Sequence, residues 1–68
     1  MTNTKKLEER ILRSGKKKVY LAKKLGVSTN GLRRYIKNES EFKASQIQIL
    51  CEELNITDLR EKEEIFFA

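Results

Sequence analysis

The sequence has no histidine, no proline and no tryptophan, and it contains one cysteine, Cys51. A single cysteine cannot form an intrachain disulfide, and the usual zinc sites need histidines or paired cysteines. Without a histidine to activate it, Cys51 at an apolar helical position is more typical of core packing than of a nucleophile. We therefore expect no metal, no cofactor and no enzymatic activity, in a reducing cytoplasmic environment.

Long apolar runs are also missing. The longest one is far too short to span a membrane, and no apolar signal segment follows the basic N-terminal stretch. With 68 residues the chain is long enough for one small domain over 1–68, of the size that buries about 60% of its unfolded surface. Few glycines, together with many Lys, Glu, Leu and Ile residues, favour short helices over strands. The composition predicts a soluble all-α protein.

Charge is distributed unevenly along the chain. The net charge is +5, but residues 1–43 carry thirteen basic against four acidic residues, whereas residues 44–68 carry two against six. Single lysines usually do no more than solvate a helix face, but a surface of one sign attracts phosphate. The first part of the chain is therefore predicted to contact nucleic acid.

Apolar spacing and capping residues predict a compact fold of five helices. The expected helices cover residues 5–13, 16–25, 29–37, 44–54 and 57–65. In the first, Leu7, Ile11 and Leu12 recur at helical spacing and are expected in the core. Ser45 and Gln48 form a possible capping box for the fourth.

Two further segments carry apolar residues. The polar stretch NESEFK, residues 38–43, predicts a loop whose Phe42 folds back onto the core. Near the end of the sequence, Ile65, Phe66 and Phe67 either cover a gap in the monomer core or form an apolar patch for a second subunit. We favour the dimer interface.

The most informative stretch is KVYLAKKLGVSTNGLRRYIK, residues 18–37. Ala22 is small where two helices would cross, and Gly26 stands where a tight turn favours a left-handed backbone. The expected buried face consists of Leu21, Leu25, Val27, Leu32 and Tyr35. This pattern resembles the helix-turn-helix of phage repressors and Cro-like proteins of the XRE type. Lys17 and Lys18 depart from it, because the family usually has a capping Thr or Ser there, followed by Gln.

The resemblance implies that residues 29–37 form the helix that reads DNA. It assigns base contacts to the first two turns, at Thr29, Asn30, Arg33 and Arg34. Phosphate contacts are expected at Lys17, Lys18, Ser28, Lys37, Asn38 and Ser40. Lysines 16, 23, 24 and 43 would add long-range attraction.

We therefore expect a Cro-like repressor that binds double-stranded operator DNA as a two-fold dimer, without a membrane or a small-molecule ligand. Two alternatives keep the same fold, an antirepressor-type module that binds a protein and an antitoxin-type autoregulator. RNA binding is a weaker alternative, because the sequence has few aromatic residues that could stack on bases.

Overall fold

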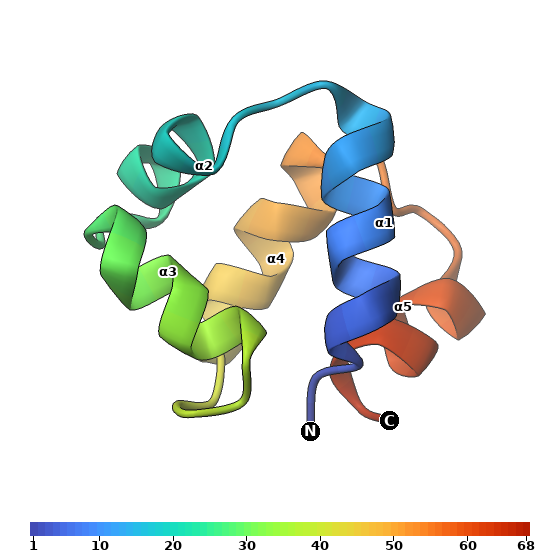
Figure 1. Ribbon diagram of the computed structural model, residues 1–68. Coiled ribbons are helices and arrows are strands. Elements are labelled where there is room, and N and C mark those ends of the chain that lie inside the picture. Colours follow the sequence, from blue (N-terminus) through green and yellow to red (C-terminus); the bar gives the residue numbers. More distant parts are fainter.

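The computed structural model describes all residues from 1 to 68 and contains five α-helices and no strand. The helices are α1 (Thr4–Ser14), α2 (Lys18–Leu25), α3 (Thr29–Ile36), α4 (Ala44–Glu53) and α5 (Leu59–Phe66). Helices α2 and α3 lie on one side of α4, and α1 and α5 lie on the other (Figure 1). The all-α, five-helix prediction is confirmed. No helix combines the length and the apolarity that crossing a membrane requires.

Local capping groups set most of the helix ends. Asn3 begins α1 by accepting a hydrogen bond from the Lys6 N–H at 3.1 Å, and Asp58 begins α5 in the same way. After α1, Gly15 adopts the left-handed backbone with φ of 73° that a helix C-cap favours. Asn55 does the same after α4, with φ of 56°. These ends agree with the sequence-based boundaries to within one or two residues.

The core is one continuous cluster to which every helix contributes. Its fully buried side chains include Leu7 of α1, Leu21 of α2, Leu32 and Ile36 of α3, Leu50 of α4 and Ile65 of α5. Phe42 folds back from the loop after α3, as predicted. Its ring stacks on Tyr35 with centroids 5.1 Å apart and meets Phe66 edge-on at 5.7 Å. The loop thereby connects α3 to α5 through aromatic contacts.

Two expectations about local structure are wrong. Leu12 is 83% exposed, because it lies about 100° around α1 from Ile11 and so points away from the core. The capping box of α4 does not involve Ser45 and Gln48. Instead, the helix begins at Ala44, and the Gln46 side chain accepts a hydrogen bond from the Lys43 N–H at 2.8 Å.

The aromatic tail also differs from the favoured expectation. Ile65 and Phe66 are only 1% and 3% exposed, so they complete the core of the monomer and offer no surface to a second subunit. Assigning these two residues to a dimer interface was therefore incorrect. Phe67 is 60% exposed and stays available for such a contact.

Candidate nucleic-acid interface

The turn between α2 and α3 brings these two helices together at a close crossing. Ala22 is 2% exposed, and its carbonyl accepts a hydrogen bond from the Val27 N–H at 3.0 Å across the turn. Gly26 adopts φ of 74° between them. Ser28 then caps α3, its hydroxyl accepting a hydrogen bond from the Gly31 N–H at 2.9 Å. The predicted roles of Ala22 as the small residue at the helix crossing and of Gly26 as the left-handed turn are confirmed.

Gly31 has a local reason to be a glycine. A Cβ at this position would lie 3.2 Å from the Ser28 hydroxyl oxygen and 3.6 Å from the Val27 Cβ. The missing side chain therefore leaves room for the capping hydroxyl, at some cost in intrinsic helix propensity.

Helix α3 separates an apolar face from a polar one. Leu32 and Ile36 are buried, and Tyr35 is half-buried against Phe42. The polar side chains on the remaining surface of α3 and its C-cap are the exposed Asn30, Arg33, Arg34 and Lys37 and the half-buried Thr29. The Arg33 guanidinium donates a hydrogen bond to the Asn30 side-chain oxygen at 3.3 Å, so these two groups lie side by side one turn apart. The structure thus brings the expected base-reading residues together on one helix.

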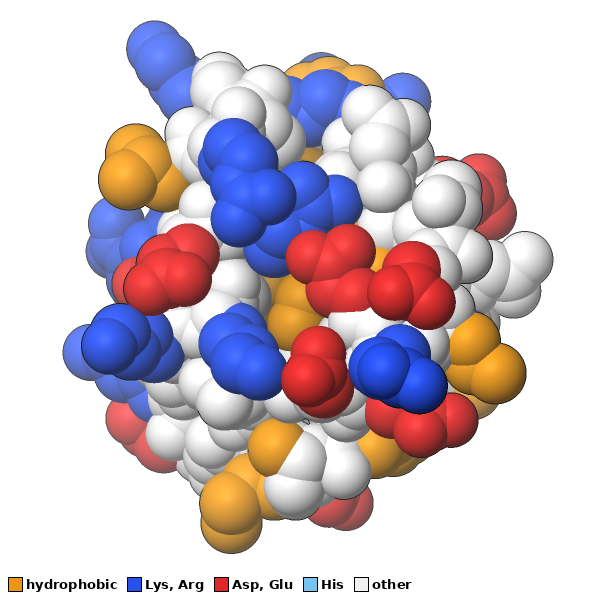
Figure 2. Space-filling model, turned by 90° about the vertical axis from the view of Figure 1, so that its right-hand side faces the viewer, with side chains coloured by type: hydrophobic (Ala, Val, Ile, Leu, Met, Phe, Trp, Pro, Cys, Tyr) orange, Lys and Arg blue, Asp and Glu red, His pale blue; other side chains and the backbone are white.

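Most cations of the motif form no ion pair. The four ion pairs are Lys6 with Glu64, Arg10 with Glu61, Lys16 with Glu53 and Lys18 with Glu8. None of them involves Lys23, Lys24, Arg33, Arg34 or Lys37. Acidic and basic side chains intermix on the face that includes α1 and α5 (Figure 2). Residues 18–37 also contain no acidic residue, so α2 and α3 carry positive charge that no side chain of their own neutralises.

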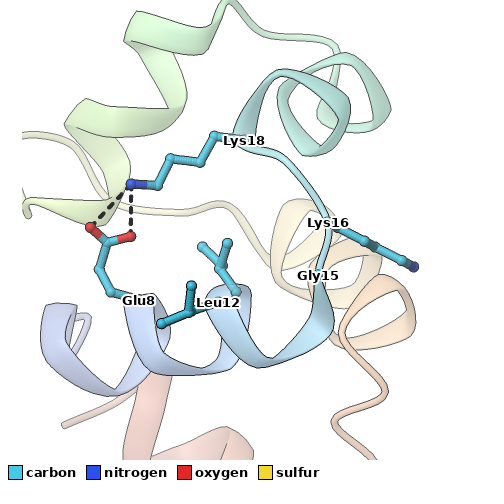
Figure 3. Close-up of a pocket in the computed structure, with 6 residues that line it drawn as sticks. Glu8, Leu12, Gly15, Lys16 and Lys18 are labelled. Carbon is cyan, nitrogen blue, oxygen red and sulfur yellow. Dashed lines mark hydrogen bonds and ion pairs between the residues drawn. The ribbon is translucent and has the colours of Figure 1, made fainter.

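The start of α2 is the exception within the motif. Lys17 occupies the N-cap and forms no capping hydrogen bond with its side chain. The Lys18 ammonium lies 2.9 Å and 3.1 Å from the two carboxylate oxygens of Glu8 on α1 (Figure 3). The carboxylate of Glu8 thus holds Lys18, one of the three lysines assigned to DNA phosphate.

Several other sequence-assigned residues are engaged within the protein. Both polar groups of the Asn38 side chain bind the backbone of Thr2, at 2.8 Å and 2.7 Å. Asn38 therefore has a structural role within the monomer, and its phosphate contact stays a prediction. Lys16 likewise donates to the carboxylate of Glu53 at 2.9 Å, so its charge is compensated. Lys17, Lys37 and Ser40 are exposed.

The residues that sequence reasoning missed lie outside the motif. Thr4 donates its hydroxyl hydrogen to the Ile36 carbonyl at 2.5 Å, which ties the last turn of α3 to the start of α1. Glu8 contacts Lys18 across ten positions of sequence. No local pattern predicts either contact, because each depends on how α1 packs beside the motif.

Cys51 is buried in α4, as expected for a core position. Removal from water raises the pKa of its thiol, which keeps the group protonated and unreactive.

The chain matches the model of a known protein family. A family model described as helix-turn-helix matches residues 7–62, which is most of the chain. No curated protein and no solved structure matches significantly. The matched region begins within α1 and ends within α5, so it includes the whole motif and the core that supports it.

Proposed function

The chain belongs to the XRE-type helix-turn-helix family of DNA-binding transcription regulators, and we propose that it is a Cro-like repressor that occupies operator DNA. In this proposal α3 enters the major groove, which is about 12 Å wide, while α2 crosses the phosphate backbone. Occupying the operator blocks transcription directly. The observation that carries the proposal is the set of exposed cations on α2 and α3 that no carboxylate neutralises.

The side chains on α3 fit a base-reading role. Arg33 and Arg34 each present a guanidinium that can donate two hydrogen bonds to guanine. Asn30 can pair in the same way with adenine, and the Thr29 methyl group can contact a thymine methyl. The hydrogen bond between Arg33 and Asn30 shows that the two groups can lie side by side on the exposed face of α3.

Phosphate contacts would position α3 without reading sequence. Lys17 and Lys37 are exposed and form no ion pair, so they can reach the backbone on either side of the groove. The first N–H groups of α3, next to Ser28, and the exposed hydroxyl of Ser40 supply further donors.

We further propose that the protein binds its operator as a homodimer. One reading helix of eight residues covers a short site, and a two-fold dimer places two such helices about 34 Å apart, one DNA turn. Phe67 and Met1 are 60% and 73% exposed, and the Ala68 N–H donates to the Met1 carbonyl at 3.0 Å. These two apolar side chains lie on adjoining backbone segments and form the candidate contact surface.

The test is a titration of the protein against three nucleic acids at two salt concentrations. These are a DNA duplex selected for binding to this protein, called the selected duplex below, an unrelated DNA duplex and a structured RNA. We expect the selected duplex to bind most tightly, and both duplexes to bind more weakly as salt rises because condensed counterions are released from phosphates. About three to five phosphate contacts per subunit would give a slope of about −3 to −4.5 for each bound subunit in a plot of log affinity against log salt, and about twice that for the dimer. Equal binding to all three, or binding to RNA alone, would contradict the proposal.

Phosphate and base contacts can be separated within the same assay. Lys17→Ala should weaken the selected and the unrelated duplex by the same factor, because a phosphate contact carries no base identity. Loss on the selected duplex alone would contradict this role for Lys17.

A further inference from the structure

Glu8 is an acidic side chain beside cations of the proposed DNA-binding surface. It projects from α1 toward the start of α2, where its carboxylate contacts the Lys18 ammonium through both oxygens (Figure 3). A surface hollow of about 190 Å³ beside this pair is lined by Glu8, Lys18, Arg33, Ile36 and Lys37. Glu8 is the only acidic residue in this lining, which also contains three cations.

The ion pair between Glu8 and Lys18 contributes little to the stability of the fold. The Lys18 and Glu8 side chains are 32% and 43% exposed, so solvent screens their attraction and the pair stabilises the fold only slightly. Its larger effect is on charge, because it neutralises a lysine at the start of a helix that crosses the DNA backbone. A phosphate approaching Lys18 must displace the carboxylate or bind beside it.

We propose that Glu8 is a specificity-determining residue that limits binding to unrelated DNA by keeping Lys18 from phosphate. This inference rests on the proposed function. On arbitrary DNA the protein can shift along the backbone until every free cation meets a phosphate, and this attraction supplies almost all of the affinity. On the operator the base contacts of α3 fix the position, so a freed Lys18 gains a phosphate only where that fixed geometry provides one. Glu8 therefore weakens non-specific binding more than specific binding.

The chain provides a matched control for the test. Glu9 is the next residue on α1, is exposed and forms no ion pair. Glu8→Gln and Glu9→Gln therefore remove the same charge from the same helix, but only the first releases Lys18. Both variants of the full chain are titrated with the selected and the unrelated duplex over a range of salt, and circular dichroism checks that both are folded.

We expect Glu8→Gln to bind the unrelated duplex about threefold or more tighter than Glu9→Gln at low salt, with a salt slope steeper by about one. The ratio of specific to non-specific affinity should fall in Glu8→Gln alone. In a Lys18→Met background the Glu8→Gln change should have no further effect beyond that of Glu9→Gln, because the lysine it releases is gone.

Two results would overturn the inference while leaving the proposed function intact. One is that Glu8→Gln and Glu9→Gln have the same affinities and salt slopes on both duplexes, which would mean that Glu8 acts only through the net charge of the protein. The other is a gain in affinity that persists in the Lys18→Met background. A wild-type protein that binds neither duplex would instead overturn the proposed function and this inference together.

Discussion

Asn38 and Thr2 form a reciprocal pair in which one side chain binds both backbone groups of one residue. The Thr2 N–H donates to the Asn38 side-chain oxygen at 2.8 Å, and the Asn38 amide donates to the Thr2 carbonyl at 2.7 Å. Asn38 follows the C-cap of α3 with φ of 66°, and Thr2 is buried. Together with the bond from Thr4 to the Ile36 carbonyl, this pair attaches the end of the reading helix to the segment before α1.

Replacing Asn38 tests this attachment. Asn38→Gly tolerates the positive φ but loses both hydrogen bonds, so we expect the free energy of unfolding to fall by about 1–3 kcal/mol. Asn55→Gly is the control, because Asn55 also has positive φ and its side chain forms no hydrogen bond. Its effect should stay within about 0.5 kcal/mol in urea unfolding. Equal effects of the two substitutions would show that the pair contributes nothing.

Because α2 and α3 cross closely at Ala22, a larger side chain at this position should destabilise the fold. Ala22→Leu adds three carbons to a side chain that is 2% exposed, and overpacking should lower stability by about 1–3 kcal/mol. Ala44→Leu is the matched control at the exposed start of α4, where the same change should be nearly neutral. Thermal melting followed by circular dichroism compares them. An unchanged melting temperature for Ala22→Leu would contradict the close crossing.

The two arginines of α3 should contribute to sequence preference. Arg33→Ala or Arg34→Ala should cost about 1–3 kcal/mol on the selected duplex and relax the preference at one base position, if that arginine binds guanine through two hydrogen bonds. Arg60→Ala on α5 removes an exposed arginine without an ion pair, and it should leave the base preference unchanged. Binding to a set of single-base variants of the duplex measures this. If both α3 variants kept the base preferences of the wild-type protein, a base-reading role of these arginines would be refuted.

The two neighbouring phenylalanines should behave differently. Phe66→Ala should destabilise the fold by about 3–5 kcal/mol, because the side chain is 3% exposed in the core. Phe67→Ser should leave the melting temperature nearly unchanged but weaken self-association, since this side chain is 60% exposed. Sedimentation with and without a two-half-site duplex measures the oligomeric state. A Phe67→Ser protein that dimerises as well as wild type would place the dimer contact elsewhere.

Glu53 should make the stability of the fold change with pH in the acidic range. Hydrogen bonds from Lys16 and Tyr20 lower the pKa of its carboxyl group in the folded protein. Because the pKa of Glu53 is lower in the folded than in the unfolded protein, the ionised carboxylate stabilises the fold. This stabilisation is fully present above the ordinary glutamate pKa of about 4.3, and it is lost as pH falls through the lower folded pKa. Glu53→Gln should therefore be less stable than wild type at neutral pH, and the difference should shrink in acid.

Urea unfolding of both proteins at neutral and at acidic pH measures this difference. Glu52→Gln, on the exposed face of α4, is the control, because it removes the same charge from a side chain that forms no ion pair. A difference between Glu53→Gln and wild type that stayed constant with pH would mean that the carboxylate charge plays no part.

The sequence determined the features that depend on short-range geometry. Ala22, Gly26 and Ser28 each act within a few residues of chain, as a small crossing residue, a left-handed turn and a helix cap. These interactions are local, so the spacing of the three residues predicted the motif. Apolar spacing and capping residues along the rest of the chain predicted the other helices. The return of Phe42 to the core could be predicted because it is the only large apolar side chain in a polar loop.

The tertiary structure decided everything that depends on how α1 and α5 pack against the motif. Helical spacing places Leu12 and Ile11 about 100° apart but cannot say which of them the rest of the protein covers. The burial of Phe66 beside the exposed Phe67 depends on the space left by four other helices. Asn38 binds Thr2, and Lys18 binds Glu8, and each contact joins residues that are separated in sequence. Only the packed fold brings those charges and backbone groups within hydrogen-bonding distance, and so decides which cations remain free for DNA.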